Sequence, residues 1–400
     1  MTAAETGTGR YRDALRVVEF RAIALSSLVS ILGDSAAYLA VTVLVYQRTG
    51  SALLSSLTFA VAFVPYLFGG TLLSGLVDRW PPKRLLVGCD LVAATLVVLM
   101  AIPGMPIATA FIALFLVGTL APVRSGAASA IVADILPGDA FVPGRSVMRI
   151  IAQSAQIVGA AAGGALLGFL SPQGALMLDA VSFVISAGVI TGVLNARPAA
   201  GPAVDGRLVA GSLAGLRDVW AQPRVRRLLL LSWLVSFVAV APEGLAAPAV
   251  AHSGYSSAYV GLWLTAIPVG TVAGDLLFVW FVPSRYRQRL TWPLALAVPG
   301  TLAGFLAAPD LPLALALLVI SGAMSAYGLG LDQALRSATP PSLLARTYAL
   351  SSAGLMAIQG AGFAAAGALG DQFGPSPAIA TAGLAGVAAV AMLRVWRAGS

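Results

Sequence analysis

The chain has 400 residues, of which 58% are hydrophobic and only 10% are charged. This composition, with a mean hydropathy of +0.90, excludes an ordinary soluble globular protein. The formal net charge of +8 would favour a nucleic-acid partner in a soluble protein. We attribute it instead to basic loops between membrane segments and expect no nucleic-acid binding.

Apolar stretches recur along the whole chain, and each approaches or exceeds the ~20 residues that a membrane-spanning helix needs. There are twelve of them, at 22–46, 53–77, 85–102, 107–132, 145–169, 174–194, 227–250, 257–282, 291–307, 312–335, 344–369 and 377–395. The pattern predicts twelve transmembrane helices.

Basic residues fall on alternate loops of this pattern, and Arg48 alone lies on the opposite side. They occur at Arg10, Arg12, Arg16 and Arg21; Arg79, Lys83 and Arg84; Arg145 and Arg149; the arginines of 197–227; Arg285, Arg287 and Arg289; Arg336 and Arg346; and Arg394 and Arg397. Basic residues near helix ends are retained in the cytoplasm. We therefore expect a multi-pass protein of the inner membrane, with cytoplasmic tails at 1–21 and 396–400.

The chain reads as two six-helix halves, 22–195 and 227–395. They are joined by a cytoplasmic linker, 196–226, whose segment 206–222 has the spacing of an amphipathic helix. A shift of 203 residues places 156–166 on 359–369, with a shared glutamine, a shared glycine and a shared Gly-Ala-Leu ending. This match favours parallel repeats. The expected fold is all-α, with twelve transmembrane helices in two pseudo-symmetric six-helix bundles.

The loop after the second segment reads Ser74-Gly-Leu-Val-Asp-Arg-Trp-Pro-Pro-Lys-Arg84. It resembles the loop signature of the major facilitator superfamily, although Ser74, Pro81 and Pro82 depart from the usual pattern. The resemblance implies a conformational switch that includes Gly75, Asp78, Arg79, Lys83 and Arg84.

Two further stretches resemble transporters of the same superfamily. Gly159-Ala-Ala-Ala-Gly-Gly164 is similar to the helix 5 motif of antiporters, with Ala160 where proline is usual; ordinary close packing by Gly159, Gly163 and Gly164 is the alternative. Pro122-Val-Arg-Ser-Gly126 and Asp134-Ile-Leu-Pro137 resemble exporters related to the enterobactin exporter. The resemblance implies the major facilitator fold and an exporter.

Polar residues form stripes on helices that are otherwise apolar, as expected for the wall of a watery cavity. In the superfamily, helices 1, 5, 7 and 11 line this cavity. The candidate cavity residues are Ser27, Ser30, Asp34 and Tyr38; Gln153 and Gln156; Ser232, Ser236 and Glu243; and Tyr348, Ser352 and Gln359. An ionisable group in a membrane span costs about 2.5–3.5 kcal/mol on insertion scales. We therefore expect Asp34 and Glu243 to couple transport to protons. The alternatives are a structural hydrogen bond for Asp34 and a solvated position in the outer part of helix 7 for Glu243.

Other charges within the spans have structural explanations. Asp90 and Arg124 lie at similar depths, so we expect a fixed or gating ion pair that belongs to the conformational switch. Asp179, Asp275 and Asp332 are expected to cap or pair locally. The chain has one cysteine, one histidine and no phosphate-binding loop. We therefore expect no enzyme activity, metal, cofactor or ATP coupling.

These features together predict a proton antiporter that exports a small amphipathic compound, such as a drug, a siderophore or a natural product. Its expected partners are this small-molecule substrate, protons and membrane lipids, and the expected state is a monomer. A solute importer of the same fold and a non-transporting membrane sensor or lipid-binding protein are the alternatives.

Overall fold

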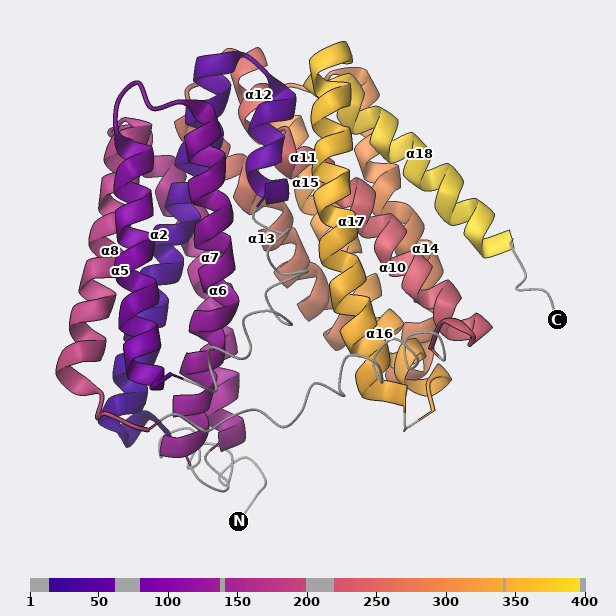
Figure 1. Cartoon of the computed structure of the whole chain (residues 1–400). Helices are drawn as coiled ribbons and strands as arrows, with labels where there is room; N and C mark the ends of the chain where they lie inside the picture. Colours follow the sequence, from indigo (N-terminus) through magenta and orange to yellow (C-terminus); the bar gives the residue numbers. More distant parts are fainter. Residues whose placement is uncertain (1–13, 62–79, 137–140, 199–218, 341–342, 396–400) are drawn as a thin grey trace. The chain divides into compact units, whose positions relative to one another are not determined.

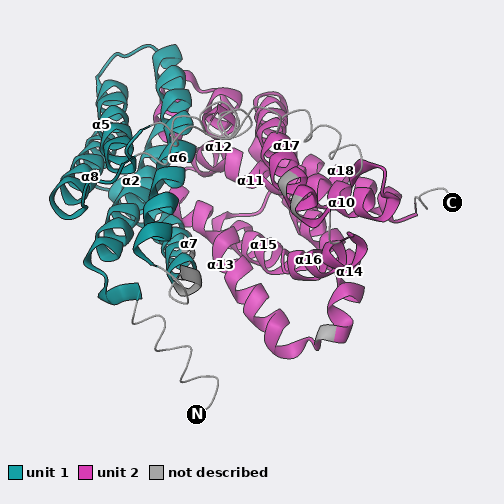
Figure 2. Ribbon diagram, turned by 60° about the horizontal axis from the view of Figure 1, so that its bottom comes forward, with its two compact units in different colours: residues 1–41, 65–204 teal, residues 42–64, 205–400 magenta. Residues whose placement is uncertain are grey.

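The structure is a computed structural model that describes residues 14–61, 80–136, 141–198, 219–340 and 343–395. Every regular element among these residues is a helix (Figure 1). The chain divides into two compact units (Figure 2). Unit 1 comprises residues 1–41 and 65–204, and unit 2 comprises residues 42–64 and 205–400.

Unit 1 is built from the first part of α2 and four further helices. These are α2 (Val18–Thr49), α5 (Pro82–Ala101), α6 (Ile107–Ile135), α7 (Phe141–Leu166) and α8 (Pro172–Val193). Prolines at the first turns of α5 and α8 suit helix starts, because the first backbone N–H groups of a helix have no intrahelical acceptor. α5 packs against both α6 and α8. The core of unit 1 holds large, fully buried side chains such as Phe20, Leu86, Ile131 and Ile190.

Unit 2 contains the end of α2, a helix at Ala52–Val61 and nine further α-helices. These are α10 (Pro223–Ala239), α11 (Ala241–Gly244), α12 (Ala246–His252), α13 (Ala258–Phe281), α14 (Ser284–Leu302) with the 3-10 turn η2 (Ala303–Ala307), α15 (Leu311–Met324), α16 (Tyr327–Ala338), α17 (Leu344–Phe373) and α18 (Pro375–Val395). α10 packs on α17, α13 on α15, and α14 on α18.

The predicted membrane segments coincide with helices wherever the structure describes them. Within the described residues, ten helices are long and apolar enough to cross a membrane, and Ala52–Val61 and Ile150–Leu166 are shorter apolar helices. The all-helical membrane fold is therefore confirmed, and the helices are consistent with twelve spans. The segment 53–77 is described only as far as Val61, and most of the linker segment 206–222 lies outside the described residues.

Two predicted segments are less regular than expected. The segment 227–250 is divided into α10, α11 and α12, because Pro242 and Pro248 lack a backbone N–H and their rings oppose continuous helix. The segment 312–335 is divided between α15 and α16 at Ser325 and Ala326. The boundaries proposed for the two halves stay a prediction, and unit 2 includes residues 42–64.

Candidate functional site

A buried ion pair lies in the interior of unit 1. The Nε of Arg124 on α6 donates to Oδ1 of Asp90 on α5 at 2.6 Å, and the Asp90 side chain has no exposed surface. A second nitrogen of Arg124 donates to the hydroxyls of Ser26 at 3.0 Å and Ser186 at 3.2 Å. The Ser186 hydroxyl in turn donates to the other carboxylate oxygen of Asp90. The network connects α2, α5, α6 and α8 and neutralises both charges.

Two more carboxylates lie near this pair. Asp179 on α8 is only 1% exposed and accepts a hydrogen bond from Ser182 at 3.1 Å. It lies directly against Gly33, where an added Cβ would overlap its carboxylate. The neighbouring Asp34 is partly exposed, and its charge interacts with that of Asp179.

The charges of this group do not balance. Asp90 pairs with Arg124 and Asp34 interacts electrostatically with the same guanidinium, whereas Asp179 interacts with Asp34. A buried group with more carboxylates than cations is chemically suited to bind a proton. The local pairing expected of Asp179 is confirmed by its bond from Ser182, three residues along the same helix.

The polar stripe of α2 changes character along the helix. Ser27 and Ser30 are buried at 6% and 1% exposure, whereas Asp34 and Tyr38 are partly exposed. Only the middle of the predicted stripe is therefore accessible in this structure.

Glu243 lies on the four-residue helix α11, between the two interruptions of the seventh predicted segment. Its side chain is exposed although Ala241, Pro242 and 244–250 are all buried. The indole N–H of Trp263 holds this segment by donating to the Pro242 carbonyl at 2.7 Å. The carboxylate is therefore exposed at the surface of unit 2, on an otherwise well-packed stretch of helix.

The other predicted cavity residues differ in exposure. On α10, Ser232 and Ser236 are partly buried; on α17, Tyr348 and Ser352 are exposed and Gln359 is partly buried. On α7, Gln156 is exposed, and the side chain of Gln153 lies outside the described part of the chain.

The glycines of α7 allow it to pack closely against α2. A Cβ on Gly159 would lie 2.7 Å from the Ser35 Cβ, and one on Gly163 would lie 2.8 Å from the Ala36 Cα. Gly164 is buried beside them. Small residues are thus required at this contact, whatever further role the motif has.

A glycine of unit 2 also makes a close contact between helices. A Cβ on Gly362 of α17 would overlap the Phe237 carbonyl of α10 and lie 2.8 Å from Val240 Cγ2. A 203-residue shift places Gly362 on Gly159 and Phe237 on Asp34, whereas Gly159 contacts Leu32 and Ser35, so the two contacts differ in register. The internal repeat stays a prediction.

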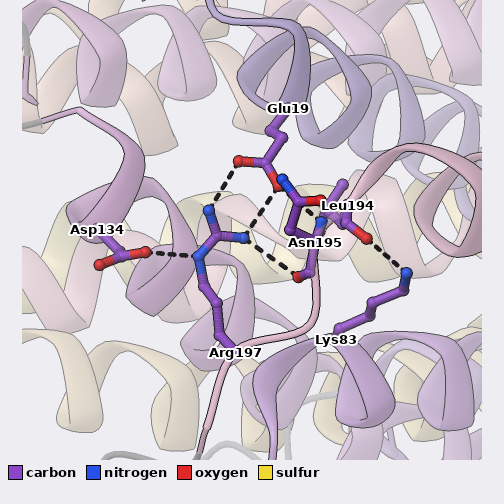
Figure 3. A network of polar contacts seen from close by, with 6 residues as sticks. All are labelled: Glu19, Lys83, Asp134, Leu194, Asn195 and Arg197. Atoms are coloured by element: carbon purple, nitrogen blue, oxygen red, sulfur yellow. Dashed lines mark hydrogen bonds and ion pairs between the residues drawn. The ribbon is translucent and has the colours of Figure 1, made fainter.

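Charged side chains also tie together the end of unit 1 where α2 and α5 begin (Figure 3). Arg197 makes a two-pronged pair with Glu19, with nitrogen–oxygen distances of 2.7 and 3.1 Å, and also pairs with Asp134. The hydrogen bond with Glu19 is the main reason that the pKa of Arg197 is raised above its ordinary value. The Asn195 N–H donates to Glu19 at 2.7 Å. One arginine thus joins the start of α2, the end of α6 and the segment after α8.

Lys83, a member of the predicted switch loop, lies at the same end. Its ammonium donates to the Thr191 carbonyl at 2.9 Å and to that of Leu194, so it caps the end of α8. Arg84 is exposed, and both basic residues line a cavity of about 700 Å³. Gly75, Asp78 and Arg79 lie outside the described residues.

Among the described residues, no group of three or more His, Cys, Asp or Glu side chains is placed to hold a metal ion. The chemistry that the described arrangement offers is proton binding and ion pairing.

Residues 23–326 match the family profile described as Major Facilitator Superfamily. The multidrug efflux pump Tap of Mycolicibacterium fortuitum is 27% identical over 317 residues, which cover 75% of this chain and 76% of that protein. The macrolide efflux protein A of Streptococcus pyogenes is 22% identical over 282 residues, covering 68% of each chain.

Solved transporters share the fold. A crystal structure of the nucleoside transporter NupG (D323A mutant) has a TM-score of 0.76 at 13% identity, over 94% of this chain and 99% of that one. A bacterial homolog to the human lysosomal transporter Spinster has a TM-score of 0.69 at 16% identity, over 94% of each chain.

Proposed function

Because this multi-pass membrane protein belongs to the major facilitator superfamily, we propose that it exports a small amphipathic compound of the drug or natural-product type in exchange for protons. Its sequence relatives support the direction, since they are named as efflux proteins for multiple drugs and for macrolides. Family membership supports a transporter of small molecules rather than an enzyme.

The excess of carboxylates over cations around Arg124 in unit 1 is the observation that carries the proton coupling. Asp90 is paired with Arg124, which leaves Asp34 and Asp179 without a cation of their own among the described side chains. Asp34 is partly exposed and Asp179 is not, so Asp34 is the one that can exchange protons with water. We assign Asp34 the principal role.

The proposed cycle follows from this assignment. Asp34 takes up a proton from the outer solution, and the neutral side chain favours reorientation toward the cytoplasm. There it loses the proton as cargo is captured. Coupling requires that protonation differ between the two facing states, because a ligand bound equally in both shifts no equilibrium. Glu243 has a secondary role, as an accessible acid in unit 2 that can bind a proton or a cationic part of the cargo.

The location of the protein in the membrane and its conformational switch complete the proposed transport cycle. The protein lies in the inner membrane as a monomer. Both termini lie in the cytoplasm, an orientation that the distribution of basic loops supports. The loop containing Gly75, Asp78 and Arg79, together with Lys83, Arg84 and the Asp90–Arg124 pair, biases the choice between facing states. Membrane lipids contact the exposed apolar side chains of the helices, such as Val184 and Leu262.

Transport in proteoliposomes under an imposed pH gradient tests the proposal. A labelled macrolide and a panel of amphipathic drugs serve as probes, with vesicles lacking a gradient and Asp34→Asn vesicles as controls. We expect concentrative transport only in the unmodified protein with a gradient. Gradient-independent equilibration of a probe would indicate the importer or facilitator alternative, and no flux of any probe would favour a sensor or lipid-binding role.

A further inference from the structure

The side chain of Asp371 joins two helices that are distant in the sequence. It lies near the end of α17, and one of its oxygens accepts a bond from the backbone N–H of Ala52 at 2.5 Å. Its other oxygen accepts from the Ser51 hydroxyl at 2.8 Å. A carboxylate from α17 therefore caps the start of the helix Ala52–Val61.

Tight packing continues along both helices from this cap. A Cβ on Gly367 would lie 2.7 Å from the Leu53 Cα and would overlap the Ser56 hydroxyl. That hydroxyl donates to the Phe363 carbonyl at 2.9 Å. The rings of Phe59 and Phe363 then stack with their centroids 5.1 Å apart. The contact is thus a continuous seam, with the Asp371 cap at one end and the stacked rings at the other.

The two sides of this seam come from different predicted repeats. The helix Ala52–Val61 belongs to the half 22–195 and α17 to the half 227–395, yet both lie in unit 2. Alternating access requires the two halves to separate at one end in one of the facing states. A seam that joins them at one end can therefore persist in only one of those states.

We propose that Asp371 is a positioning residue of the transport cycle, a latch that stabilises the state in which this end is closed. The inference rests on the proposed function, because only a transporter that alternates needs to open the seam. The physical basis is the charge of the carboxylate at a helix start, where unpaired N–H groups favour an anion. Opening the seam returns these N–H groups and the carboxylate to water, so the latch shifts an equilibrium without contacting cargo.

Labelling of a buried position measures the latch without any transport assay. Ala60 is 7% exposed and packs in a small core with Phe363. Because Cys89 is the single cysteine of the chain, Ala60→Cys in a Cys89→Ser background gives one reporter. The purified protein in nanodiscs is treated with a polar maleimide. We expect Asp371→Asn to raise the labelling rate of this cysteine by roughly threefold to tenfold, the effect of losing a charged cap.

Asp310→Asn is the matched control. Asp310 also caps a helix start, but it does so within its own element, by accepting from the Leu313 N–H of α15 at 3.3 Å. Its replacement should leave the labelling rate of Ala60→Cys unchanged. Equal rates for the parent protein and Asp371→Asn would overturn the latch, as would an equal increase caused by Asp310→Asn.

A disulfide cross-link tests the same contact by holding it closed, whereas Asp371→Asn weakens it. Ser51→Cys and Asp371→Cys in the Cys89→Ser background place two thiols where oxygen atoms now lie 2.8 Å apart. Oxidation should arrest transport, and a reductant should restore it. A cross-linked protein with full transport would overturn the proposal. Faster labelling of Asp371→Asn in a protein that exports no probe would support the latch and contradict the proposed export, whereas unchanged labelling in an active exporter would overturn the latch alone.

Discussion

Arg124 and Asp90 meet through a 2.6 Å bond from the guanidinium Nε to Oδ1, in the interior of unit 1. The Arg124 side chain is 15% exposed and that of Asp90 is not exposed. Asp90 is fully removed from water and Arg124 largely so, and each charge therefore depends on the other and on the serine hydroxyls around them. Removing one partner leaves an uncompensated charge, whereas removing both leaves a neutral polar site.

The first prediction is that this pair is non-additive. Asp90→Asn and Arg124→Gln should each lower stability by about 3–5 kcal/mol, and the double variant should lose clearly less than the sum. Thermal unfolding in detergent, followed by size-exclusion chromatography, gives the comparison. Asp134→Asn is the control, because Asp134 is 63% exposed and its ion pair should contribute about 0–1 kcal/mol. Additive losses for Asp90 and Arg124 would contradict the coupling.

The second prediction concerns the ion pairs that Arg197 makes with Glu19 and Asp134. Arg197→Gln leaves the Glu19 carboxylate, which is 15% exposed, without its two-pronged partner, and should cost about 1.5–3 kcal/mol. Arg197→Lys keeps the charge but not the paired geometry, so it should recover only part of this loss.

Because its pKa is raised, Arg197 keeps its charge at alkaline pH. Its contribution to the free energy of unfolding should therefore not change with pH in that range. The stability due to a group with a raised pKa is lost only as the pH rises through its folded-state pKa, and arginine starts from a pKa above about 12. Unfolding midpoints of the protein and of Arg197→Gln should therefore keep a constant separation between about pH 7 and pH 9. If the difference between the two unfolding midpoints vanishes within this range, another group that titrates there must contribute to the Arg197–Glu19 ion pair.

The third prediction compares two glycines of unit 1. Gly159→Ala inserts a methyl group where the Ser35 Cβ would be 2.7 Å away, so α7 must move away from α2, at a cost of about 1–3 kcal/mol. Gly188→Ala meets nothing within 4 Å and should be neutral or slightly stabilising, since alanine favours a helix over glycine. The unfolding midpoints of Gly159→Ala and Gly188→Ala, measured under the same conditions, test this difference. Equal behaviour of the two variants would contradict the close approach of α7 and α2.

Sequence reasoning was most successful where hydrophobic length or charge balance determines the structure. The apolar segments predicted the helices, and similar depth in the membrane was enough to bring Asp90 and Arg124 together. It was least successful where the answer depends on which helices are neighbours. Periodicity shows that residues share a face but not what that face contacts.

Particular residues illustrate this limit. Ser186 binds the Asp90–Arg124 pair from α8, and no spacing within α8 indicates it. Asp371 is an acid at a helix end in the sequence, and only the fold shows that it caps Ala52, 319 positions away. Ser27 and Ser30 belong to the predicted stripe, yet they are buried.

The fourth prediction is that Asp78→Asn impairs cycling more than cargo affinity. Asp78 lies outside the described residues, and the prediction rests on the resemblance of its loop to the superfamily signature. A charge at a helix end can bias one conformation without contacting the cavity. Equilibrium binding and transport, measured on one preparation, should show near-normal affinity with a clearly lower turnover. Unchanged transport would show that this loop, with its altered Pro81 and Pro82, does not act as a switch.

The fifth prediction is that Asp34 is the principal proton-linked acid. Asp34→Asn fixes a neutral side chain, so it should abolish uphill export driven by a pH gradient while sparing cargo binding and downhill exchange. Glu243→Gln should have a smaller effect, chiefly on cationic cargo, because Glu243 is exposed in unit 2.

The control for this assignment is Asp275→Asn, which removes an acid from α13 to which no proton-coupling role is assigned. Export should be assayed in the same vesicles with and without the gradient, and proton release on cargo addition should be measured with a pH-sensitive dye. Loss of both signals in Asp34→Asn, with both retained in Asp275→Asn, is the expected outcome. If Asp34→Asn still concentrates cargo against its gradient, the coupling proton binds elsewhere, and Asp179, which lies against Gly33, becomes the next acid to replace.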